Sequence, residues 1–322
     1  MLAISSTGNE TLEDAHNYCG NGSFSAISQA NTLTIGLFST LTSPGGQFRC
    51  IMTAVKDSPE ELGGPALQNQ LECDCGWRIS PRIVGGHEPR INEFPWMAGI
   101  IDLRIRMLWC GANIISEFFV LTAAHCIDQK PPDMLAVLTG EHNLTTGNDT
   151  PATAIYLVST YVIHPDYEDT YYTGDIAIVQ TKTQILFSFY VGPICLPFQY
   201  TNYNFVGEVV TILGWGSMEY FGPTSDVILE TLVTIVSNEQ CAQQFGMIID
   251  KQICTYGEKR DACYRDSGGP LLWAHANSAR LHLIGIISQG RLCGGDIPSV
   301  NTKVTPYLSW IVSTTGVTFC SR

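Results

Sequence analysis

Short runs of apolar residues separated by turn residues recur along the chain from residue 83 onward. Clear examples are Val137–Thr139, Val209–Leu213 and Leu283–Ile287. Short strands bounded by turn signals are typical of β-barrels and β-sandwiches. In residues 306–312 the pattern changes, because the apolar residues there recur with a helical period. We therefore expect an all-β unit followed by a C-terminal helix.

An earlier zone, residues 11–56, is rich in Ser, Thr, Gly and Asn. Within it, Asn31–Thr40 alternates polar and apolar residues as a half-buried strand does, and Gln47–Val55 is a second strand candidate after a Pro-Gly-Gly turn. We expect a disulfide between Cys19 and Cys50 to join these strands. The alternative is a disordered Ser/Thr-rich leader, because both strands are short.

The pattern divides the chain into four parts. Residues 1–10 stay unassigned, and residues 11–56 form the small β-rich zone. Residues 57–82 are polar, contain Gly and Pro, and are interpreted as a linker. Residues 83–322 form the large all-β unit.

Composition excludes several function classes. The chain has 322 residues, which allows one to three domains, and 45% of them are apolar, enough for a packed core. Charged residues make up only 15% and the net charge is −13, which argues against nucleic-acid binding because that requires clustered Lys and Arg. No apolar run has the length of a membrane helix, and Gly111–Ala124 is interrupted by Glu117. We expect neither a nucleic-acid partner nor a membrane span.

Twelve cysteines, an even number, predict a disulfide-bonded, secreted protein. Sequons at Asn9, Asn21, Asn143 and Asn148 agree with export and with a glycoprotein. The first ten residues have neither the basic nor the apolar region of a signal peptide, so we expect that the signal peptide is not present in this sequence. No cysteine spacing fits a zinc site, and we expect no metal and no other cofactor.

Three short motifs carry candidate chemistry. Ser267 stands in Asp-Ser-Gly-Gly-Pro, whose glycines let the main chain approach a substrate. A serine hydroxyl is a weak nucleophile unless a base and an orienting acid accompany it. His125, in Leu-Thr-Ala-Ala-His-Cys, is the candidate base, and Asp175, in Gly-Asp-Ile-Ala-Ile, is the candidate acid. The alternatives are His164 as the base and Asp175 as an ordinary turn residue.

In their order and spacing these motifs resemble those of trypsin-like serine proteases of the chymotrypsin fold. The resemblance covers residues 83 to about 316. It implies a double six-stranded antiparallel β-barrel with a C-terminal helix. It also implies that His125 is the general base, that Asp175 orients it, and that Ser288 hydrogen-bonds Asp175.

The segment Arg82-Ile83-Val-Gly-Gly resembles the activation site of that family, which implies that residues 57–82 are an activation segment as well as a linker. The resemblance implies that cleavage after Arg82 frees the Ile83 ammonium, which then pairs with Asp266 and orders the substrate pocket. The alternative is an exposed basic turn that is not processed. A buried carboxylate requires a charged partner, so the pairing is physically reasonable.

The resemblance also assigns residues that contact substrate. Asp261 matches the floor of the pocket that selects Arg or Lys, and Gly290 matches a pocket wall. Ser299 stands where the family has glycine, so its side chain narrows the pocket. The main-chain N–H groups of Arg265 and Ser267 are implied as the oxyanion hole, and Arg265 again replaces a glycine while keeping its N–H.

Disulfides follow from the resemblance rather than from spacing. The implied pairs are Cys110–Cys126, Cys241–Cys254, Cys263–Cys293 and, across the activation cleavage, Cys75–Cys195. Cys73 and Cys320 are left, and their pairing stays open.

Residues 11–56 resemble the second half of a CUB domain, with a Cys-Gly turn, a Leu-Thr-Ile strand and a Gly-rich turn. With Cys-Asp-Cys-Gly-Trp at residues 73–77, the arrangement is similar to arthropod CUB-serine proteases, including venom serine proteases. The fold expected is therefore an all-β double barrel preceded by a partial CUB-like β-sandwich.

The function predicted is that of a secreted zymogen of a serine endopeptidase that cleaves after Arg or Lys. Its expected partners are a protein or peptide substrate, an upstream activating protease and protein inhibitors. The alternative is a catalytically weak homologue with a regulatory or binding role, because Arg265 and Ser299 depart from the family pattern.

Overall fold

The computed structural model of the protein describes residues 2–5, 16–18, 34–37, 74–79, 88–147, 149–217, 223–257, 266–275, 280–289 and 297–320. By its internal contacts the chain divides into two units, Met1–Pro65 and Ala66–Arg322.

The first unit contains a three-stranded antiparallel sheet in the order β2-β1-β3. Its strands are β1 (Leu2–Ser5), β2 (His16–Tyr18) and β3 (Thr34–Leu37). β3 lies inside the strand expected at Asn31–Thr40, whereas β1 falls in a segment that the pattern left unassigned. The second expected strand, Gln47–Val55, lies outside the described residues, as do Cys19 and Cys50. The CUB-like interpretation therefore stays a prediction.

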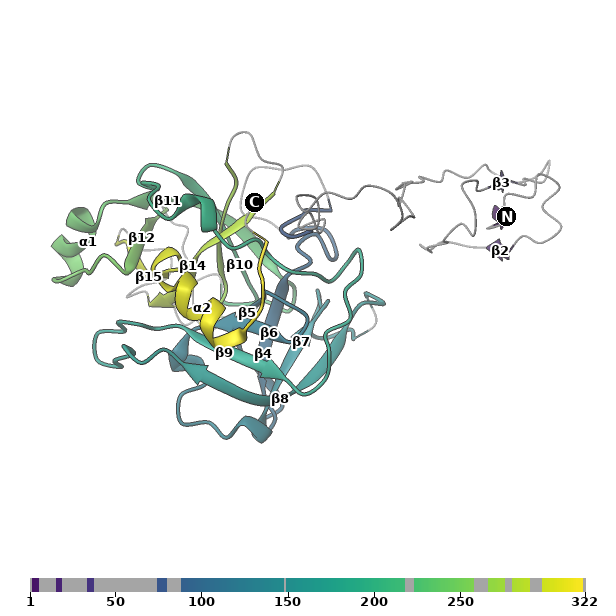
Figure 1. Ribbon diagram of the computed structural model, residues 1–322, viewed down its shortest axis with the longest axis horizontal. Coiled ribbons are helices and arrows are strands. Elements are labelled where there is room, and N and C mark those ends of the chain that lie inside the picture. The colour runs from purple at the N-terminus through teal and green to yellow at the C-terminus, as the bar shows by residue number, and fades with distance from the viewer. Residues whose placement is uncertain are drawn as a thin grey trace, which may run out of the picture. The chain divides into compact units, whose positions relative to one another are not determined.

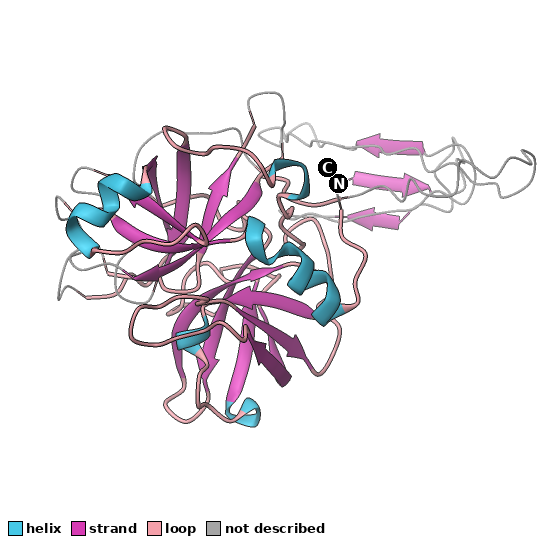
Figure 2. Ribbon diagram, turned by 60° about the vertical axis from the view of Figure 1, so that its left-hand side comes forward, coloured by secondary structure: helices cyan, strands magenta, loops and turns pink. Residues whose placement is uncertain are grey.

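The second unit consists of two closed six-stranded antiparallel barrels (Figures 1 and 2). The first has the order β4 (Met97–Asp102), β5 (Met107–Ile114), β6 (Phe119–Thr122), β9 (Ala177–Thr181), β8 (Ala154–Ile163) and β7 (Leu135–Thr139). The second has the order β10 (Val209–Gly214), β11 (Leu229–Val236), β12 (Gln252–Tyr256), β15 (Ser299–Lys303), β14 (His282–Gln289) and β13 (Pro270–Trp273). The all-β double barrel expected from the resemblance is confirmed.

Each barrel closes around large apolar side chains that are fully or almost fully buried. Trp96, Ile100 and Leu121 belong to the core of the first barrel, and Ile212 and Trp273 to that of the second. Because a closed barrel leaves no unpaired strand edge, the main-chain polar groups are satisfied within it. The two barrels thus form a rigid support for the loops between their strands.

Two α-helices lie within the described part of the chain. The expected C-terminal helix is α2 (Leu308–Thr315), preceded by a short 3-10 turn, Thr305–Tyr307, and it buries Leu308 and Ile311. The other, α1 (Asn238–Phe245), was not expected, because it is largely polar and buries only Cys241. Its start is nevertheless marked by Ser237, whose side chain accepts a hydrogen bond from the Gln240 N–H as a helix N-cap.

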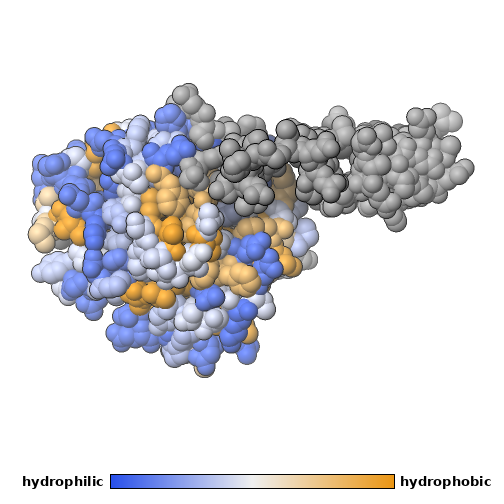
Figure 3. Space-filling view, in the orientation of Figure 1, coloured by the Kyte–Doolittle hydropathy of each residue, from blue (hydrophilic) through white to orange (hydrophobic). Residues whose placement is uncertain are grey.

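The face shown in Figure 3 is mainly polar, with apolar residues gathered in patches. Exposed apolar side chains follow β9 in the sequence, where Leu186 is 71% and Phe189 is 52% exposed. Among the helices that the structure describes, none is long and apolar enough to cross a membrane.

Candidate active site

His125 is placed by a single 3-10 turn, Ala124–Cys126, that directly follows β6. Ala124 and Cys126 on either side are buried, and the Cys110–Cys126 disulfide ties the turn to β5. The His125 side chain stays 22% exposed. A group that exchanges protons with a substrate must be accessible. Here the neighbours of His125 are packed in the interior while the imidazole itself can be reached.

Asp175 is completely buried and holds His125 at two points. Its Oδ1 accepts a hydrogen bond from the main-chain N–H of His125 at 2.9 Å, and its Oδ2 lies 2.8 Å from His125 Nδ1. Because a carboxylate can only accept, Nδ1 carries the proton and Nε2 is left with its lone pair. In this arrangement the Nε2 atom of the neutral imidazole can accept a proton.

Two residues of the second barrel donate further hydrogen bonds to Asp175. The Ser288 hydroxyl donates to Asp175 Oδ2 at 2.5 Å, and the Thr302 hydroxyl donates to the Asp175 carbonyl oxygen at 2.8 Å. Ser288 was expected in this position by resemblance. Thr302 was missed, since nothing in its local sequence distinguishes it. The site is thus built across both barrels.

Ser267 lies in a loop between the barrels, close to His125. Its carbonyl oxygen accepts a hydrogen bond from the Gly111 N–H at 2.8 Å. The Cys126 sulfur lies 3.7 Å from this carbonyl oxygen and 3.8 Å from His125 Nε2. Within the described residues no hydrogen bond joins the Ser267 hydroxyl to His125, and such contacts are often loose before substrate binds.

Gly268 shows why this loop requires glycine. It adopts φ +82°, and a Cβ there would lie 2.3 Å from both the Gly111 carbonyl oxygen and the Thr122 hydroxyl. Its own carbonyl accepts a hydrogen bond from Asn113 Nδ2 at 2.9 Å. Glycine alone combines that dihedral with this close approach to the first barrel.

The carboxylate of Asp266 lies against two other glycines. The Gly216 N–H donates to Asp266 Oδ1 at 2.8 Å. A Cβ on Gly214 or Gly216 would lie 1.8 Å or 2.4 Å from the nearest Asp266 carboxylate atom. The two glycines therefore form a cradle, Gly214–Gly216, shaped to hold this side chain. The expected partner, Ile83, lies outside the described residues.

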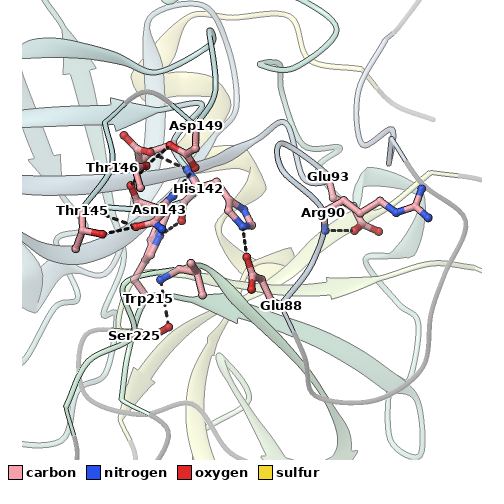
Figure 4. Close-up of polar contacts among 12 residues, drawn as sticks. Glu88, Arg90, Glu93, His142, Asn143, Thr145, Thr146, Asp149, Trp215 and Ser225 are labelled. Atoms are coloured by element: carbon pink, nitrogen blue, oxygen red, sulfur yellow. Dashed lines mark hydrogen bonds and ion pairs between the residues drawn. The ribbon is translucent and has the colours of Figure 1, made fainter. Parts of the chain in front are cut away.

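A loop of the first barrel supports this cradle (Figure 4). Trp215, between the two glycines, donates its indole N–H to the His142 carbonyl oxygen at 2.9 Å. His142 Nε2 lies 2.8 Å from Glu88 Oε1. These two contacts link Glu88 through His142 to Trp215, the residue between the two cradle glycines.

Tyr172 is a further residue that the sequence did not indicate. Its ring meets that of His125 edge-on, with the ring centroids 5.4 Å apart, and its main chain has φ +51°. Backbone of this kind is uncommon for a tyrosine and is often found at functional sites. Tyr172 therefore borders the site beside the imidazole.

His164, the alternative base, occupies a different environment. Its ring packs edge-on against Tyr307 and Trp310, with centroid distances of 4.8 Å and 4.9 Å, and its Nδ1 accepts the Asp166 N–H. Burial lowers the pKa of His164 below its usual value. The structure thus gives His164 a packing role beside α2.

The other predicted site residues divide between described and undescribed parts of the chain. Ser299 begins β15 and is 2% exposed. Those outside the described residues are Arg82, Ile83, Asp261, Arg265, Gly290, Cys73, Cys263 and Cys293. The structure forms the disulfides Cys75–Cys195, Cys110–Cys126 and Cys241–Cys254, and Cys320 is disulfide-bonded as well.

The structure also contains a cavity of about 300 Å³. It is lined mainly by apolar side chains, including Ile115, Phe118, Phe187 and Phe319. None of the predicted catalytic or substrate-binding residues lines it, although the disulfide-bonded Cys75 and Cys320 do. The chemistry is therefore assigned to the junction of the barrels and not to this cavity.

Comparison with known proteins agrees with this geometry. Residues 83–311 match the family model described as Trypsin. "Venom serine protease 34" of Apis mellifera is 39% identical over 305 residues, or 94% of this chain and 72% of the relative. "Venom serine protease" of Polistes dominula is 39% identical over 80% of this chain and 94% of its own length. "Proclotting enzyme" of Tachypleus tridentatus is 33% identical over 74% of this chain and 68% of its own length.

Proposed function

Because the chain belongs to the trypsin family of serine proteases, we propose that it is the secreted zymogen of an endopeptidase specific for Arg or Lys. Cleavage after Arg82 activates it, and Ser267, His125 and Asp175 carry out the reaction. The observation that carries this proposal is the buried Asp175 carboxylate, which holds the His125 imidazole with Nε2 free to accept a proton.

In the first half of the reaction the Ser267 hydroxyl oxygen attacks the substrate carbonyl carbon. His125 Nε2 takes the hydroxyl proton, and the Asp175 carboxylate stabilises the imidazolium that forms. The main-chain N–H groups of Ser267 and Arg265 donate to the developing oxyanion. His125 then returns the proton to the leaving amine, and an acyl-enzyme remains on Ser267.

In the second half water replaces the amine. His125 Nε2 accepts a proton from the water as its oxygen attacks the ester carbon, and the proton passes to Ser267 Oγ when the ester bond breaks. The product carboxylate leaves and the serine is restored. His125 thus acts as base and acid in turn, which requires the fixed orientation that Asp175 provides.

Activation depends on the Ile83 ammonium, which is released by cleavage after Arg82 and pairs with Asp266. The glycine cradle supports this role, because Gly214 and Gly216 leave room for a carboxylate and the Gly216 N–H already binds it. Burying a carboxylate against a new ammonium would order the adjacent Ser267 loop. The precursor would therefore be poorly active until it is cleaved.

Preference for Arg or Lys follows from the proposed position of Asp261 at the base of the pocket, where a basic side chain neutralises a buried carboxylate. Gly290 and Ser299 would line the pocket walls, and the buried Ser299 would narrow it. We therefore expect faster turnover of Arg and Lys substrates than of aromatic ones.

Secretion and cascade partners belong to the same proposal. The disulfides support an oxidising compartment. Relatives are named venom serine protease, proclotting enzyme and phenoloxidase-activating factor. We infer an extracellular protease with a protein or peptide substrate, an upstream activating protease and protein inhibitors.

The experiment treats the purified full chain with trypsin, identifies new N-termini by sequencing, and measures hydrolysis of short Arg, Lys and Phe substrates. We expect an Ile83 terminus together with Arg and Lys hydrolysis that Ser267→Ala abolishes. Cleavage at Arg82 without turnover of any substrate would favour the second candidate, a weak homologue with a regulatory role. Arg265→Gly and Ser299→Gly would then be the first variants to test for recovery.

A further inference from the structure

Residues 74–79, which we call the strap, precede the proposed activation bond and are docked on both barrels. The Cys75–Cys195 disulfide fixes one end. The Gly76 N–H donates to the Pro193 carbonyl oxygen at 2.8 Å, and the Gly76 carbonyl oxygen accepts the Leu281 N–H at 2.8 Å. The Trp77 ring covers Gly192 so closely that a Cβ there would lie 1.9 Å from it.

Arg78 in the strap forms ion pairs with two carboxylates, and its side chain is largely buried. Its side chain is only 12% exposed, and its Nε lies 2.6 Å from Glu93 Oε1. Its Nη2 lies 3.1 Å and 3.2 Å from the two carboxylate oxygens of Glu230. The guanidinium also lies 4.7 Å from the centroid of the Phe94 ring.

The two carboxylates come from different barrels and are themselves buried. Glu93 precedes β4 and is 5% exposed, and its Oε2 also accepts the Arg90 N–H at 2.8 Å (Figure 4). Glu230 lies on β11 and is 5% exposed. Two buried carboxylates without a cation would be strongly unfavourable, so the Arg78 guanidinium is held firmly between them.

The sequence places two Arg-Ile bonds four residues apart in this region, Arg78–Ile79 and Arg82–Ile83. Hydrolysis of either bond consumes one water and leaves an arginine carboxylate and an isoleucine amine. Only the second yields the Ile83 ammonium that the proposed function requires. Cleavage after Arg78 would produce a terminus four residues too early and would cut the chain inside the strap.

We propose that the clamp formed by Arg78, Glu93 and Glu230 shields the Arg78–Ile79 bond and so directs activating proteases to Arg82–Ile83. A protease specific for arginine must take the guanidinium into its own pocket, and this guanidinium is already bound on both sides. The Ile79 N–H, at the bond itself, donates to the Glu93 carbonyl oxygen at 3.2 Å. Cleavage therefore requires the strap to detach first, and the clamp makes that opening rare.

This inference rests on the proposed activation at Arg82, but the two are tested separately. The experiment uses the full chain carrying Ser267→Ala, so that it cannot cleave itself, and limited digestion with trypsin under native conditions. Mass spectrometry after reduction identifies whether the strap-containing chain ends at Arg78 or Arg82, and N-terminal sequencing identifies Ile79 or Ile83. The parent chain is compared with Glu93→Gln/Glu230→Gln and with Arg78→Lys.

In the parent chain we expect termini at Ile83 and none at Ile79. In Glu93→Gln/Glu230→Gln the guanidinium loses its charged partners, and chains ending at residue 78 should become a major product. Arg78→Lys keeps a trypsin site but places one ammonium where a guanidinium bridged two carboxylates, so cleavage after residue 78 should also rise. The second variant decides the matter if the double variant does not fold.

A matched control is Glu208→Gln, which removes a carboxylate that binds Tyr203 and Trp273 on the second barrel without touching the strap. It should cleave like the parent. Either of two results would overturn the proposed role of the clamp. One is a folded clamp variant that yields no more chains ending at residue 78 than the parent does, and the other is a parent chain that is readily cleaved after residue 78. A third result would separate the two proposals. If no chain is cleaved after Arg82 and only the clamp variants are cleaved after residue 78, the proposed activation at Arg82 is wrong and the proposed shielding by the clamp is supported.

Discussion

The carboxylate of Asp175 and the backbone and imidazole of His125 are joined by two hydrogen bonds, one at 2.9 Å to the main-chain N–H and one at 2.8 Å to Nδ1. The pair therefore has a defined position as well as a defined tautomer. Residues 125 and 175 are brought together by the closure of the first barrel, in which β6 and β9 are neighbours.

Asp175→Asn should remove most of the activity of the cleaved enzyme while leaving the fold intact. An amide can donate to Nδ1 and stabilise the tautomer that blocks Nε2, so kcat should fall about 10⁴-fold. Steady-state hydrolysis of an Arg amide substrate tests this, with thermal unfolding as the check on folding. A variant that retains near-normal kcat would contradict the assigned role.

Ser288→Ala should lower the free energy of unfolding, because it removes a hydrogen-bond donor from a fully buried carboxylate. Loss of a hydrogen bond to a charged group corresponds to about 1.5–3 kcal/mol. Urea titration measures the change. Ser313→Ala serves as the control, since that hydroxyl donates to the Trp310 carbonyl on the exposed side of α2 and should have little effect.

Gly216→Ala should impair activity by displacing Asp266. The new Cβ would lie 2.4 Å from the Asp266 carboxylate carbon, so the side chain must move. Misplacement on the scale of 1 Å can reduce turnover about 10²-fold. The comparison is kcat/KM after cleavage at Arg82, with Ser313→Ala as control, because that hydroxyl lies on the exposed side of α2 and donates only to the Trp310 carbonyl oxygen. Equal losses in both variants would refute the cradle.

Activity of the cleaved enzyme should disappear reversibly at alkaline pH. A free α-amino group has a pKa of roughly 7.7–8.0, and pairing with Asp266 would raise the pKa of the Ile83 ammonium above that. The ordering that it supplies is complete below the free value and is lost as pH rises through the raised pKa. A pH profile of kcat/KM, with recovery after return to neutral pH, tests this. An activity that persists unchanged far above pH 8 would speak against the ion pair.

Asp102 should make stability depend on acid pH. The Arg104 side chain, followed by the Arg104 N–H and Lys130, holds the pKa of the Asp102 carboxyl well below its ordinary value, although burial opposes this. Its contribution is therefore present above about pH 3.9, the unfolded value, and declines as pH falls toward the folded pKa. Unfolding free energies of the parent and Asp102→Asn, measured from about pH 6 to pH 2, should converge at the acid end. A difference in unfolding free energy between the parent and Asp102→Asn that does not change with pH would count against the prediction.

Local sequence was sufficient where the signal lay in neighbouring residues. The apolar runs and turn signals around Val209–Leu213 and Leu283–Ile287 predicted strands that the structure contains. The Asp-Ser-Gly-Gly-Pro motif singled out Ser267, and the structure gives a reason for the first glycine in the steric limits at Gly268. By contrast α1 was missed, because a short polar helix has little apolar periodicity.

By itself the sequence determined several strand segments, the fold class through its motifs, and the residue types available for chemistry. Only the tertiary structure decided that Thr302 supports Asp175, that Tyr172 borders His125, and that Arg78 lies between Glu93 and Glu230. Arg78 and Glu230 are 152 positions apart. Contacts of that kind arise from barrel closure and from the burial of charge between two barrels, and no local periodicity encodes which distant residues then meet.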